Sequence, residues 1–461
     1  MSFYCRKDRL ESLEQVWGSE GPQLVVLHGK RGVGKTSLLR HFLGEDKRHC
    51  YFLASCTSLK ENLRQFAETL VRCFPDCGFV PDDLPTIPRM LQAACQKANG
   101  ERVALVLDEF QYLLSQDASL ALGMREWWQA VAPTSGIFIV LCGSDQEAMR
   151  KLVDENTPLS ANINLDIELE PMSFFNIIVV YSGTQYSMQD KVRAYGALGG
   201  IPRYHALFNT DKSVEENIQE TILSPQGCLH NEPESMLLSN GVRDPAIYNA
   251  VLGAIADGCT RSSAIAERVG ITSNKLSFYI ESLAEMGWVS KEHPFDNASD
   301  RRAIYRIDDV FVRFWYSFVA GLRSELEFGE PQEIYDSRIA PRMEDYMRRV
   351  FVDIGHSYLQ LTNATDLLHQ SVLRSGRWWN QDGSEEIDMV AELADGSHLI
   401  GECVWTSSPI GVDVYHKLKE KASRLLGVKY VENASYLIIC SAGRDDELKQ
   451  VAGTNGLYVV G

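Results

Sequence analysis

The segment from residue 24 to residue 42 restricts the fold of this chain more than any other part of the sequence. The apolar run Leu24–Leu27 predicts a buried strand, and the glycine-rich stretch GKRGVGKT follows at Gly29–Thr36. The next residues, Ser37 to Phe42, favour a helix. A strand, a loop of the pattern GxxxxGK followed by Ser or Thr, and a helix, in this order, are typical of a phosphate-binding loop.

The chemistry of such a loop explains its residue types. The loop wraps a phosphate with its backbone N–H groups pointing inward, and we expect a Cβ at Gly29 or Gly34 to block that path. The positive end of the helix dipole then lies under the phosphates. Lys35 is predicted to bridge the β- and γ-phosphates, and the Thr36 hydroxyl to bind Mg²⁺. We therefore expect ATP and Mg²⁺ as ligands.

The whole loop is predicted to contact the nucleotide. For Lys30 and Arg31, the alternative is a solvated side chain that touches no phosphate. The predicted nucleotide-binding residues of the loop are Gly29, Lys30, Arg31, Gly32, Val33, Gly34, Lys35, Thr36 and Ser37.

A second apolar run, Arg102–Leu107, ends in the acidic pair Asp108 and Glu109. Central strands of a parallel sheet are covered on both faces and are therefore continuously apolar. Their carboxyl ends border the ligand crevice of an open α/β sheet. Asp108 is predicted to hold Mg²⁺ through water, and Glu109 to polarise the attacking water as general base. A glutamate at the second position favours hydrolysis over nucleotide binding alone.

A third apolar run, Ile137–Cys142, is followed shortly by Ser144. A polar residue at such a strand end is a candidate sensor of the γ-phosphate, and we assign this catalytic role to Ser144. The alternative is that Ser144 caps the helix expected at Asp145–Val153.

The remaining elements of this region complete an alternation of strands and helices. Tyr51–Ala54 predicts a strand, and helices are expected at Lys60–Phe74 and Ile87–Ala98. The order β-α-β-α-β-α-β predicts an α/β fold with a doubly wound parallel sheet.

Bulk properties exclude several classes of protein. With 461 residues, the chain is too long for one ordinary core, and we expect about two to four domains. A net charge of −17 argues against a broad cationic surface for nucleic acid or anionic lipid. The sequence offers no apolar run long enough to cross a bilayer and no apolar signal core at its start. Its eleven cysteines are scattered and predict free thiols in a reducing cytosol, so we expect a cytoplasmic protein with no membrane partner.

Taken together, the N-terminal motifs resemble the archaeal-type ATPases, a branch of the P-loop proteins related to the STAND and AAA+ groups. In the stretch GGIPRY, Arg203 follows the proline, and the resemblance implies that Arg203 reaches phosphate. The alternative is that Arg203 is a surface arginine without this role. The similar stretches are the acidic strand LVLDEFQYL at Leu105–Leu113, the sensor strand LCGSD at Leu141–Asp145, the start of a helical lid LEPMSF at Leu169–Phe174, and the lid motif GGIPRY at Gly199–Tyr204.

One departure from the family concerns an arginine. The family often carries a PLYGR-like stretch before the lid, and the matching residues Pro158–Asn162 end in Asn162. Where that arginine stabilises transition-state charge, hydrolysis by this chain is expected to be slow or to use another arginine. Arg150 and Arg203 are the substitutes within the chain, and a neighbouring copy is a further source.

The middle of the chain predicts a winged helix-turn-helix. An apolar helix ending at Gly258 is followed by two short amphipathic helices, Arg261–Val269 and Ser273–Met286, and then by two expected wing strands. The second short helix carries glutamates and is a poor face for phosphate, so the better candidates for DNA contact are the wing residues Arg301, Arg302 and Arg306. A purely mechanical role for this domain is the alternative to DNA binding.

The C-terminal part resembles the restriction-endonuclease-like domain that ends members of the same family. The motifs are Met343-Glu344, GRWWN at Gly376–Asn380, EEID at Glu385–Asp388 and GECVW at Gly401–Trp405. The resemblance implies a carboxylate cluster around Mg²⁺ made of Glu344, Asp388 and Glu402.

The lysine that such a nuclease needs is missing at its usual place. The family pattern places lysine at position 404, and this chain has Val404. We therefore expect a degenerate nuclease without cleavage activity, unless a lysine of the next helix replaces it. The candidates for that replacement are Lys417, Lys419 and Lys421.

The sequence thus predicts an α/β protein that is a Mg²⁺-dependent ATPase and a nucleotide-driven conformational switch. Its expected parts are a P-loop ATPase core at 1–170, a helical lid at 171–240, a winged helix-turn-helix at 241–310 and a degenerate restriction-endonuclease-like domain at 311–461. A protein partner or a second copy of the chain is a further expectation. The alternatives are an ATP-licensed DNA-binding or DNA-cleaving effector and a non-hydrolysing, nucleotide-dependent scaffold.

Overall fold

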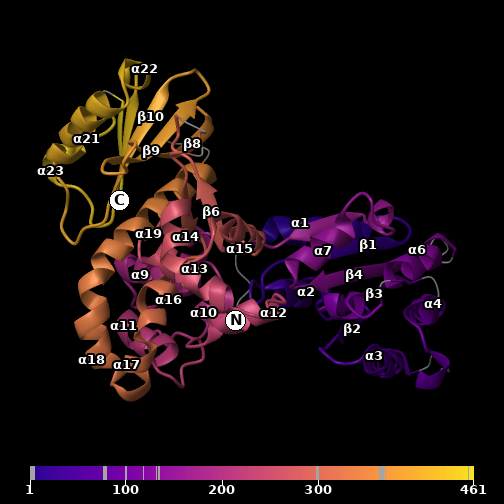
Figure 1. The fold of residues 1–461 in the computed structure, drawn as a ribbon. Coiled ribbons are helices and arrows are strands. Elements are labelled where there is room, and N and C mark those ends of the chain that lie inside the picture. Colours follow the sequence, from indigo (N-terminus) through magenta and orange to yellow (C-terminus); the bar gives the residue numbers. More distant parts are fainter. Residues whose placement is uncertain are drawn as a thin grey trace. The chain divides into compact units, whose positions relative to one another are not determined.

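The structure is a computed structural model, and it describes residues 6–75, 80–98, 101–117, 119–130, 132, 135–296, 299, 301–362, 368, 370–454 and 456–461. The chain divides into two compact units. The first unit runs from Met1 to Met172 and includes Ile201–Arg203, and the second comprises Ser173–Gly200 and Tyr204–Gly461. Figure 1 colours the chain from indigo at the N-terminus to yellow at the C-terminus.

A parallel sheet with the strand order β2-β3-β4-β1-β5 forms the centre of the first unit. The strands predicted from the apolar runs are confirmed, and β5 was not predicted because its short sequence LDIE has only one buried residue. β4 separates β1 from β3. The strands are β1 (Gln23–His28), β2 (His49–Leu53), β3 (Val103–Asp108), β4 (Ile137–Gly143) and β5 (Leu165–Glu168).

Helices cover both faces of this sheet, as Figure 1 shows. On one face, Val26 and Leu105 belong to the same buried cluster as Phe66 of α3 and Met90 of α4. On the other face, the ring of Phe138 contacts α1 and α2. Every residue of β1, β3 and β4 is buried, as expected for strands covered on both sides. The helices of this unit are α1 (Lys7–Gly18), α2 (Lys35–Leu43), α3 (Leu59–Cys73), α4 (Ile87–Ala98), α5 (Gln111–Leu114), α6 (Leu120–Ala130) and α7 (Gln146–Val153).

Aromatic packing fixes the helix that follows the phosphate-binding loop. Phe42 of α2 and Trp17 of α1 lie 5.5 and 5.2 Å from Phe138 of β4, measured between ring centroids. Trp17 and Phe42 also meet edge-to-face at 5.9 Å. Such contacts add to the burial of the rings, and they pack the C-terminal part of α2 and the end of α1 against the start of β4.

The second unit begins with a helical segment and continues into three helices and a two-stranded antiparallel sheet. The helices of the first segment are α8 (Phe174–Ile177), α9 (Met188–Leu198), α10 (Pro202–His205), whose first residues belong to the first unit, α11 (Val214–Ile218) and α12 (Glu232–Ser239). The next elements are α13 (Ala246–Ala256), α14 (Ser262–Val269), α15 (Ser273–Glu285), β6 (Val289–Glu292) and β7 (Ile304–Ile307).

The turn between α14 and α15 follows from its sequence. Gly270 ends α14 with a left-handed φ of 75°, and the Thr272 side chain caps α15. Leu276, Ile280 and Leu283 are buried on one face of α15, as predicted from their spacing.

The C-terminal part of the second unit combines helices with a mixed sheet of order β12-β11-β10-β9-β8. β8, β9 and β10 are antiparallel, and β10, β11 and β12 are parallel. The helices are α16 (Val310–Phe318), α17 (Arg323–Phe328), α18 (Pro331–Ile334), α19 (Ala340–Thr362), α21 (Val412–Leu425), α22 (Val428–Val431) and α23 (Asp446–Val451). The strands are β8 (Val372–Trp379), β9 (Glu386–Leu393), β10 (His398–Val404), β11 (Ser435–Cys440) and β12 (Leu457–Val460). Across the described ranges, every helix is too short or too polar to span a lipid bilayer.

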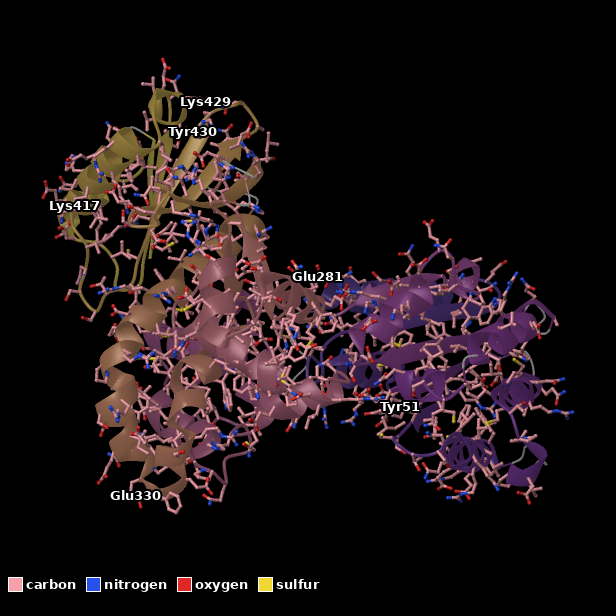
Figure 2. All side chains as sticks on the ribbon, in the orientation of Figure 1. Tyr51, Glu281, Glu330, Lys417, Lys429 and Tyr430 are labelled. Atoms are coloured by element: carbon pink, nitrogen blue, oxygen red, sulfur yellow. The ribbon has the colours of Figure 1, made fainter. Side chains whose placement is uncertain are left out.

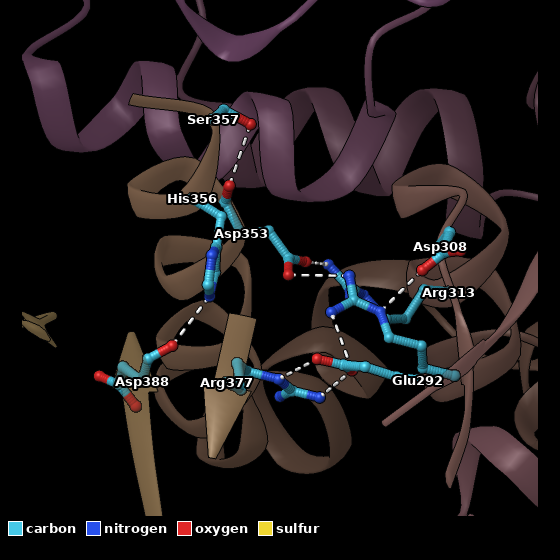
Figure 3. A network of polar contacts seen from close by, with 9 residues as sticks. Glu292, Asp308, Arg313, Asp353, His356, Ser357, Arg377 and Asp388 are labelled. Carbon is cyan, nitrogen blue, oxygen red and sulfur yellow. Dashed lines mark hydrogen bonds and ion pairs between the residues drawn. The ribbon is translucent and has the colours of Figure 1, made fainter. Parts of the chain in front are cut away.

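Charged side chains join the elements of the second unit, and we call Glu292, Arg306, Asp308, Arg313, Asp353 and Arg377 the ionic cluster (Figure 3). Asp353 of α19 accepts from Arg306 of β7 at 2.8 Å and from Arg313 of α16 at 2.7 Å. Arg377 of β8 binds Glu292 of β6 through two nitrogen–oxygen pairs at 2.9 and 2.5 Å. The cluster therefore ties the β6–β7 hairpin to the C-terminal sheet.

The charges of the cluster depend on one another. Burial by itself raises the pKa of Asp353, but Arg313 and Arg306 outweigh burial and hold this pKa below its usual range. Removing one partner from such a pair leaves an uncompensated charge.

We predict that Asp353→Asn lowers the free energy of unfolding of the second unit by about 3–5 kcal/mol at neutral pH. The loss shrinks as the pH falls below about 3.9, because the pKa of Asp353 is lower in the folded than in the unfolded chain. Urea unfolding measures both effects. Asp345→Asn removes a well-exposed carboxylate of the same helix and should change stability by no more than about 1 kcal/mol; equal effects of the two variants would contradict the prediction.

Candidate functional site

Three glycines shape the loop between β1 and α2. Gly29, Gly32 and Gly34 have positive φ values of 148°, 80° and 107°. A Cβ added to Gly29 would lie 2.2 Å from the Leu169 carbonyl oxygen, whereas among the described residues no atom beyond the adjacent chain lies within 4 Å of a Cβ added to Gly34. A side chain does not fit at position 29, because the Leu169 carbonyl oxygen is too close. A side chain at position 34 has space, but the positive φ of this residue favours glycine. That a Cβ at either position blocks the path of a phosphate stays a prediction.

Lys35 is the first residue of α2 and is buried. Its Nζ donates to the carbonyl oxygens of Gly29 at 2.7 Å and Lys30 at 3.2 Å. Burial lowers the pKa of Lys35, and the nearby Glu109 and Asp108 act in the opposite direction. The loop carbonyls thus hold the ammonium group between the loop and the acidic strand end.

Thr36 of α2 and Asp108 of β3 are brought together from separate elements. The Thr36 hydroxyl donates to Asp108 Oδ2 at 3.3 Å, although β4 lies between β1 and β3. The Tyr51 hydroxyl of β2 donates to the same carboxylate oxygen. Burial and the hydrogen bond to Asp108 raise the pKa of Tyr51. Sequence reasoning missed Tyr51, whose only signal was a hydroxyl within an otherwise apolar strand.

Glu109 follows Asp108 in a left-handed conformation with φ of 53°, which is uncommon for a residue with a side chain. Its backbone N–H donates to Asp108 Oδ1 at 2.9 Å. Its carboxylate accepts hydrogen bonds from the Ser144 hydroxyl and from the Gln111 side-chain amide. Gln111 was not predicted, and it also lies 3.2 Å from the Ser144 hydroxyl.

Ser144 therefore contacts Glu109 and is not the cap of α7. The cap is Asp145, whose carboxylate accepts from the Ala148 N–H at 3.0 Å. The alternative that Ser144 caps this helix is wrong. Instead, Ser144, which follows β4, donates a hydrogen bond to Glu109, which follows the neighbouring strand β3.

The lid motif packs against the phosphate-binding loop within the first unit. The Arg203 N–H donates to the Gly32 carbonyl at 3.4 Å, and a Cβ on Gly32 would lie 3.1 Å from side-chain atoms of both Arg203 and Ile201. The Arg203 side chain is exposed. Arg6, which was not predicted, donates to the carbonyls of Val33 at 3.3 Å and Glu170 at 2.7 Å and fixes the outer side of the loop.

The other predicted contacts differ in exposure. Lys30 is half-buried, whereas Arg31 and Ser37 are exposed, and Val33 is buried. Arg150, a candidate substitute for the missing arginine, pairs with Glu168 at 2.5 Å. Asn162 is half-buried in a short turn.

The donor atoms at Thr36 and Asp108 fit Mg²⁺, which prefers oxygen ligands and is usually held by one or two protein groups together with substrate phosphates. Among the described residues, no group of three or more His, Cys, Asp or Glu side chains is arranged to hold a metal ion without such help. This donor set suits an ion that arrives with a nucleotide.

The C-terminal domain brings together only part of its predicted site. Asp388 on β9 and Glu402 on β10 influence each other, since burial and then Glu402 raise the pKa of Asp388 to about 7. Lys421 Nζ lies 3.5 Å from Glu402 Oε2, whereas Lys417 pairs with Asp413. Figure 2 labels Lys417 on α21. Lys421 is thus the lysine of α21 that stands beside the acidic pair.

Glu344 does not join this pair. Its carboxylate accepts from the Trp405 indole at 2.7 Å and from Arg193 at 3.4 Å. In the described part of the chain, Glu344, Asp388 and Glu402 do not form one metal-binding group. The prediction that Glu344 supplies the third carboxylate is therefore not supported by its contacts.

The arginines of the predicted wing are mostly engaged inside the second unit. Arg306 belongs to the ionic cluster, and Arg302 pairs with Asp296 at 3.2 Å and donates to the Trp379 carbonyl. Arg301 is exposed. Glu281 projects from α15 and is also exposed (Figure 2). The positive charge available for DNA is therefore reduced both on α15 and on the β6–β7 hairpin.

Comparisons with known proteins agree with this geometry. Residues 3–208 match a family described as an ATPase domain predominantly from Archaea. Residues 315–424 match a family described as archaeal and bacterial proteins of unknown function.

Individual relatives are distant. An uncharacterized protein of Methanocaldococcus jannaschii is 24% identical over 427 residues, which cover 90% of this chain and 92% of that protein. An uncharacterized ATP-binding protein of the same organism is 44% identical over 45 residues, or 10% of this chain and 76% of that protein. A Walker-type ATPase of Pyrococcus abyssi has a similar structure, with a TM-score of 0.52, 19% identity, and coverage of 68% of this chain and 96% of that chain. The last similarity shows a shared fold.

We predict that Gly29→Ala lowers the free energy of unfolding of the first unit by more than about 1 kcal/mol without nucleotide, because its Cβ meets a carbonyl oxygen and its φ is positive. Gly18→Ala is the control, since a Cβ at the end of α1 has no atom within 4 Å. This control should be neutral or more stable by about 0.5–1 kcal/mol. Urea unfolding of the two variants decides; equal stability would show that the loop does not need glycine at position 29.

Proposed function

We propose that this chain, whose residues 3–208 match a family described as an ATPase domain predominantly from Archaea, binds ATP with Mg²⁺ and hydrolyses it to ADP and phosphate. One observation carries the proposal. The ammonium group of Lys35, the Thr36–Asp108 pair and the Glu109 carboxylate all stand at the carboxyl edge of one parallel sheet. Ligands of open α/β sheets bind at this edge.

The loop and α2 would bind the phosphates. Its glycines give the backbone the positive φ values with which N–H groups line an anion site. The N-terminal end of α2 adds the positive end of its dipole. Lys35 now donates to two loop carbonyls, and a short movement of its flexible side chain would redirect the ammonium group to the β- and γ-phosphates.

Thr36 and Asp108 would hold Mg²⁺, the first directly and the second through water. The ion neutralises charge that develops on the phosphates during transfer. Tyr51 has a positioning role, since its hydroxyl donates to Asp108 and fixes one carboxylate oxygen. The other oxygen accepts the Glu109 N–H, so the carboxylate is held from two sides.

Glu109 would act as the general base toward the attacking water. Its carboxylate is engaged by Ser144 and Gln111, which restrict its rotation. Ser144 would thereby couple the γ-phosphate position at the end of β4 to the orientation of the base. Asn162 stands where relatives often have an arginine, so we expect slow turnover unless Arg203 or a neighbouring copy supplies the positive charge.

We further propose that the nucleotide drives a conformational switch. Ile201–Arg203 belong to the first unit and contact Gly32, whereas the residues on both sides of this tripeptide belong to the second unit. A change of the loop at Gly32 on phosphate binding would therefore act on the chain that leads into α9 and α10. Ligand-dependent ordering of such segments is a common way to couple a nucleotide to larger motions.

The acidic pair gives the sharpest prediction. Glu109→Gln should lower kcat for ATP about 100-fold or more, because the amide cannot accept the proton of water, and should leave the Kd for Mg-ATP nearly unchanged. Phosphate release and calorimetric titration measure the two quantities. Glu101→Gln, which changes an exposed glutamate before the other end of β3, should keep full activity. Unchanged turnover in Glu109→Gln would contradict the role of Glu109 as general base, and absence of turnover in the wild type would favour the non-hydrolysing scaffold.

A second candidate function, ATP-licensed DNA cleavage, is favoured by one contact. Lys421 stands 3.5 Å from Glu402 and supplies the cation that Val404 does not. We rank this candidate second because Glu344 is engaged by Trp405, and because Arg302 and Arg306 have partners within the protein. A mechanical role for α13–α15 and the β6–β7 hairpin agrees better with the ionic cluster.

Incubation with supercoiled plasmid, ATP and either Mg²⁺ or Mn²⁺ tests the second candidate. We expect the plasmid to stay supercoiled. Cleavage that disappears in Asp388→Ala and persists in Asp413→Ala, which alters an exposed carboxylate of α21, would establish the nuclease and overturn this ranking.

A further inference from the structure

Helix α9 is packed along one of its sides against the C-terminal part of the second unit (Figure 1). Gln189, Arg193 and Gly196 follow one another at intervals of four and three residues, which place them on the same side of the helix. These three residues tie α9 to α19 and to the segment that follows β10. Their contacts differ in exposure from one end of the helix to the other.

The last turn of α9 is anchored by buried contacts. The hydroxyl of Tyr346, a buried residue of α19, donates to the Gly196 carbonyl at 2.8 Å. A Cβ added to Gly196 would lie 2.8 Å from Met347 Sδ, so glycine allows α19 to lie this close. Gly199, which ends α9, is also close to α16, since a Cβ there would lie 3.1 Å from the Phe311 nitrogen. This end of α9 is therefore fixed to two neighbouring helices.

The first turns of α9 are held by more exposed contacts. The Gln189 side-chain amide donates to the Thr406 carbonyl at 2.9 Å. The Arg193 guanidinium lies 5.6 Å from the centre of the Trp405 ring and 3.4 Å from a Glu344 carboxylate oxygen. The Glu344 side chain is 57% exposed, and exposed ion pairs are weak. This end of α9 can therefore separate from its neighbours more easily than the last turn.

The segment that these first turns contact joins the carboxyl ends of two parallel strands. Trp405 and Thr406 follow β10 directly, and Ser441 follows β11. The Thr406 N–H donates to the Ser441 hydroxyl at 2.8 Å, and this hydroxyl donates to the Thr406 carbonyl at 2.7 Å. Gln189 of α9 donates to the same carbonyl oxygen. Because ligands of open α/β sheets bind at the carboxyl ends of the strands, α9 covers a sheet edge of the kind that binds ligands.

The chain leads from α9 directly to the phosphate-binding loop. The helix ends at Leu198, and Ile201 lies against Gly32, since a Cβ on Gly32 would be 3.1 Å from an Ile201 side-chain carbon. A change of the loop on binding a triphosphate would therefore act first on the anchored end of α9. From Gly196 to Gln189 the helix spans about 10 Å, so a small rotation at the anchored end becomes a larger displacement at Gln189.

We propose that Gln189 and Arg193 form a latch on the C-terminal sheet, which opens when Mg-ATP binds to the phosphate-binding loop. In the closed latch, α9 holds Trp405 and Thr406 at the carboxyl end of β10. Opening releases this segment together with the Glu344 carboxylate, and it makes the sheet edge accessible to a ligand from solvent. The opening rests on the proposed binding of ATP, whereas the contacts of the closed latch do not.

Hydrogen exchange of the full chain, followed by mass spectrometry, tests the latch. The ligand is the β,γ-imido analogue of ATP with Mg²⁺, which is not hydrolysed at the γ-phosphate, and calorimetry checks that it is bound. We expect slower exchange in residues 29–37 and exchange about 5-fold faster, or more, in residues 405–408. Exchange around Tyr346 should stay the same, because its contact with α9 is buried.

Two variants test the contacts of the latch without nucleotide. Arg193→Ala removes the ion pair with Glu344 and the contact with Trp405. Residues 405–408 should therefore exchange faster in this variant than in the wild type, and the analogue should add a smaller further change. Lys191→Ala is the control, because this lysine is two residues from Arg193 and lies on another side of α9. It should behave as the wild type does.

The possible results separate the latch from the proposed ATP binding. If the analogue slows exchange in residues 29–37 but leaves residues 405–408 unchanged, the latch is overturned and the binding of ATP stands. If the analogue does not bind, both proposals are overturned. If Arg193→Ala without nucleotide exchanges as the wild type does in residues 405–408, the latch is overturned whatever the analogue does.

Discussion

A buried ammonium group organises the nucleotide site. Burial disfavours the charged form of Lys35, yet the group is held by two loop carbonyls and lies near two carboxylates. These carbonyls face it only because Gly29, Gly32 and Gly34 adopt positive φ values. The conformation of the loop, the position of the cation and the placement of the acidic strand end are therefore parts of a single arrangement.

The order of strands makes this arrangement possible. Inserting β4 between β1 and β3 places Ser144 between the loop and the acidic pair, where its hydroxyl reaches Glu109. The terminal strand β2 contributes Tyr51 to Asp108, and β5 on the opposite side leads to the Leu169 carbonyl that excludes a side chain at Gly29. Each strand of the sheet thus supplies or constrains one group of the site.

Local sequence predicted the parts of the site that depend on neighbours along the chain. The loop, the apolar strands and the acidic pair follow from short patterns, because a strand, a turn and a helix start are each encoded within a few residues. Tyr51 and Arg6 were missed because their roles arise from contacts between separate segments. Gln111 lies only two residues from Glu109, but its contact with Ser144 also joins separate segments. The spacing of residues within one segment carries no information about such contacts.

In the second unit, the predictions for charged residues also missed partners that come from other segments of the chain. Arg302 and Arg306 are charged residues of a hairpin, and the sequence alone did not reveal that Asp296 and Asp353 would pair with them. Glu344 was expected beside Asp388 and Glu402, but the Trp405 indole engages its carboxylate. Lys421, one of the lysines considered as a replacement, does stand next to Glu402. A charge in a sequence predicts a role only when its partners are known.

The most direct test of the central claim is the affinity of the full chain for Mg-ATP, measured by calorimetry with and without Lys35. We predict that Lys35→Ala weakens binding about 10-fold or more, since a charge-assisted contact contributes about 1.5–3 kcal/mol. Lys47→Ala, which alters a lysine paired with Glu14 after the end of α2, should bind as the wild type does. Absence of Mg-ATP binding by the wild type, or equal affinity of Lys35→Ala and the wild type, would contradict the account.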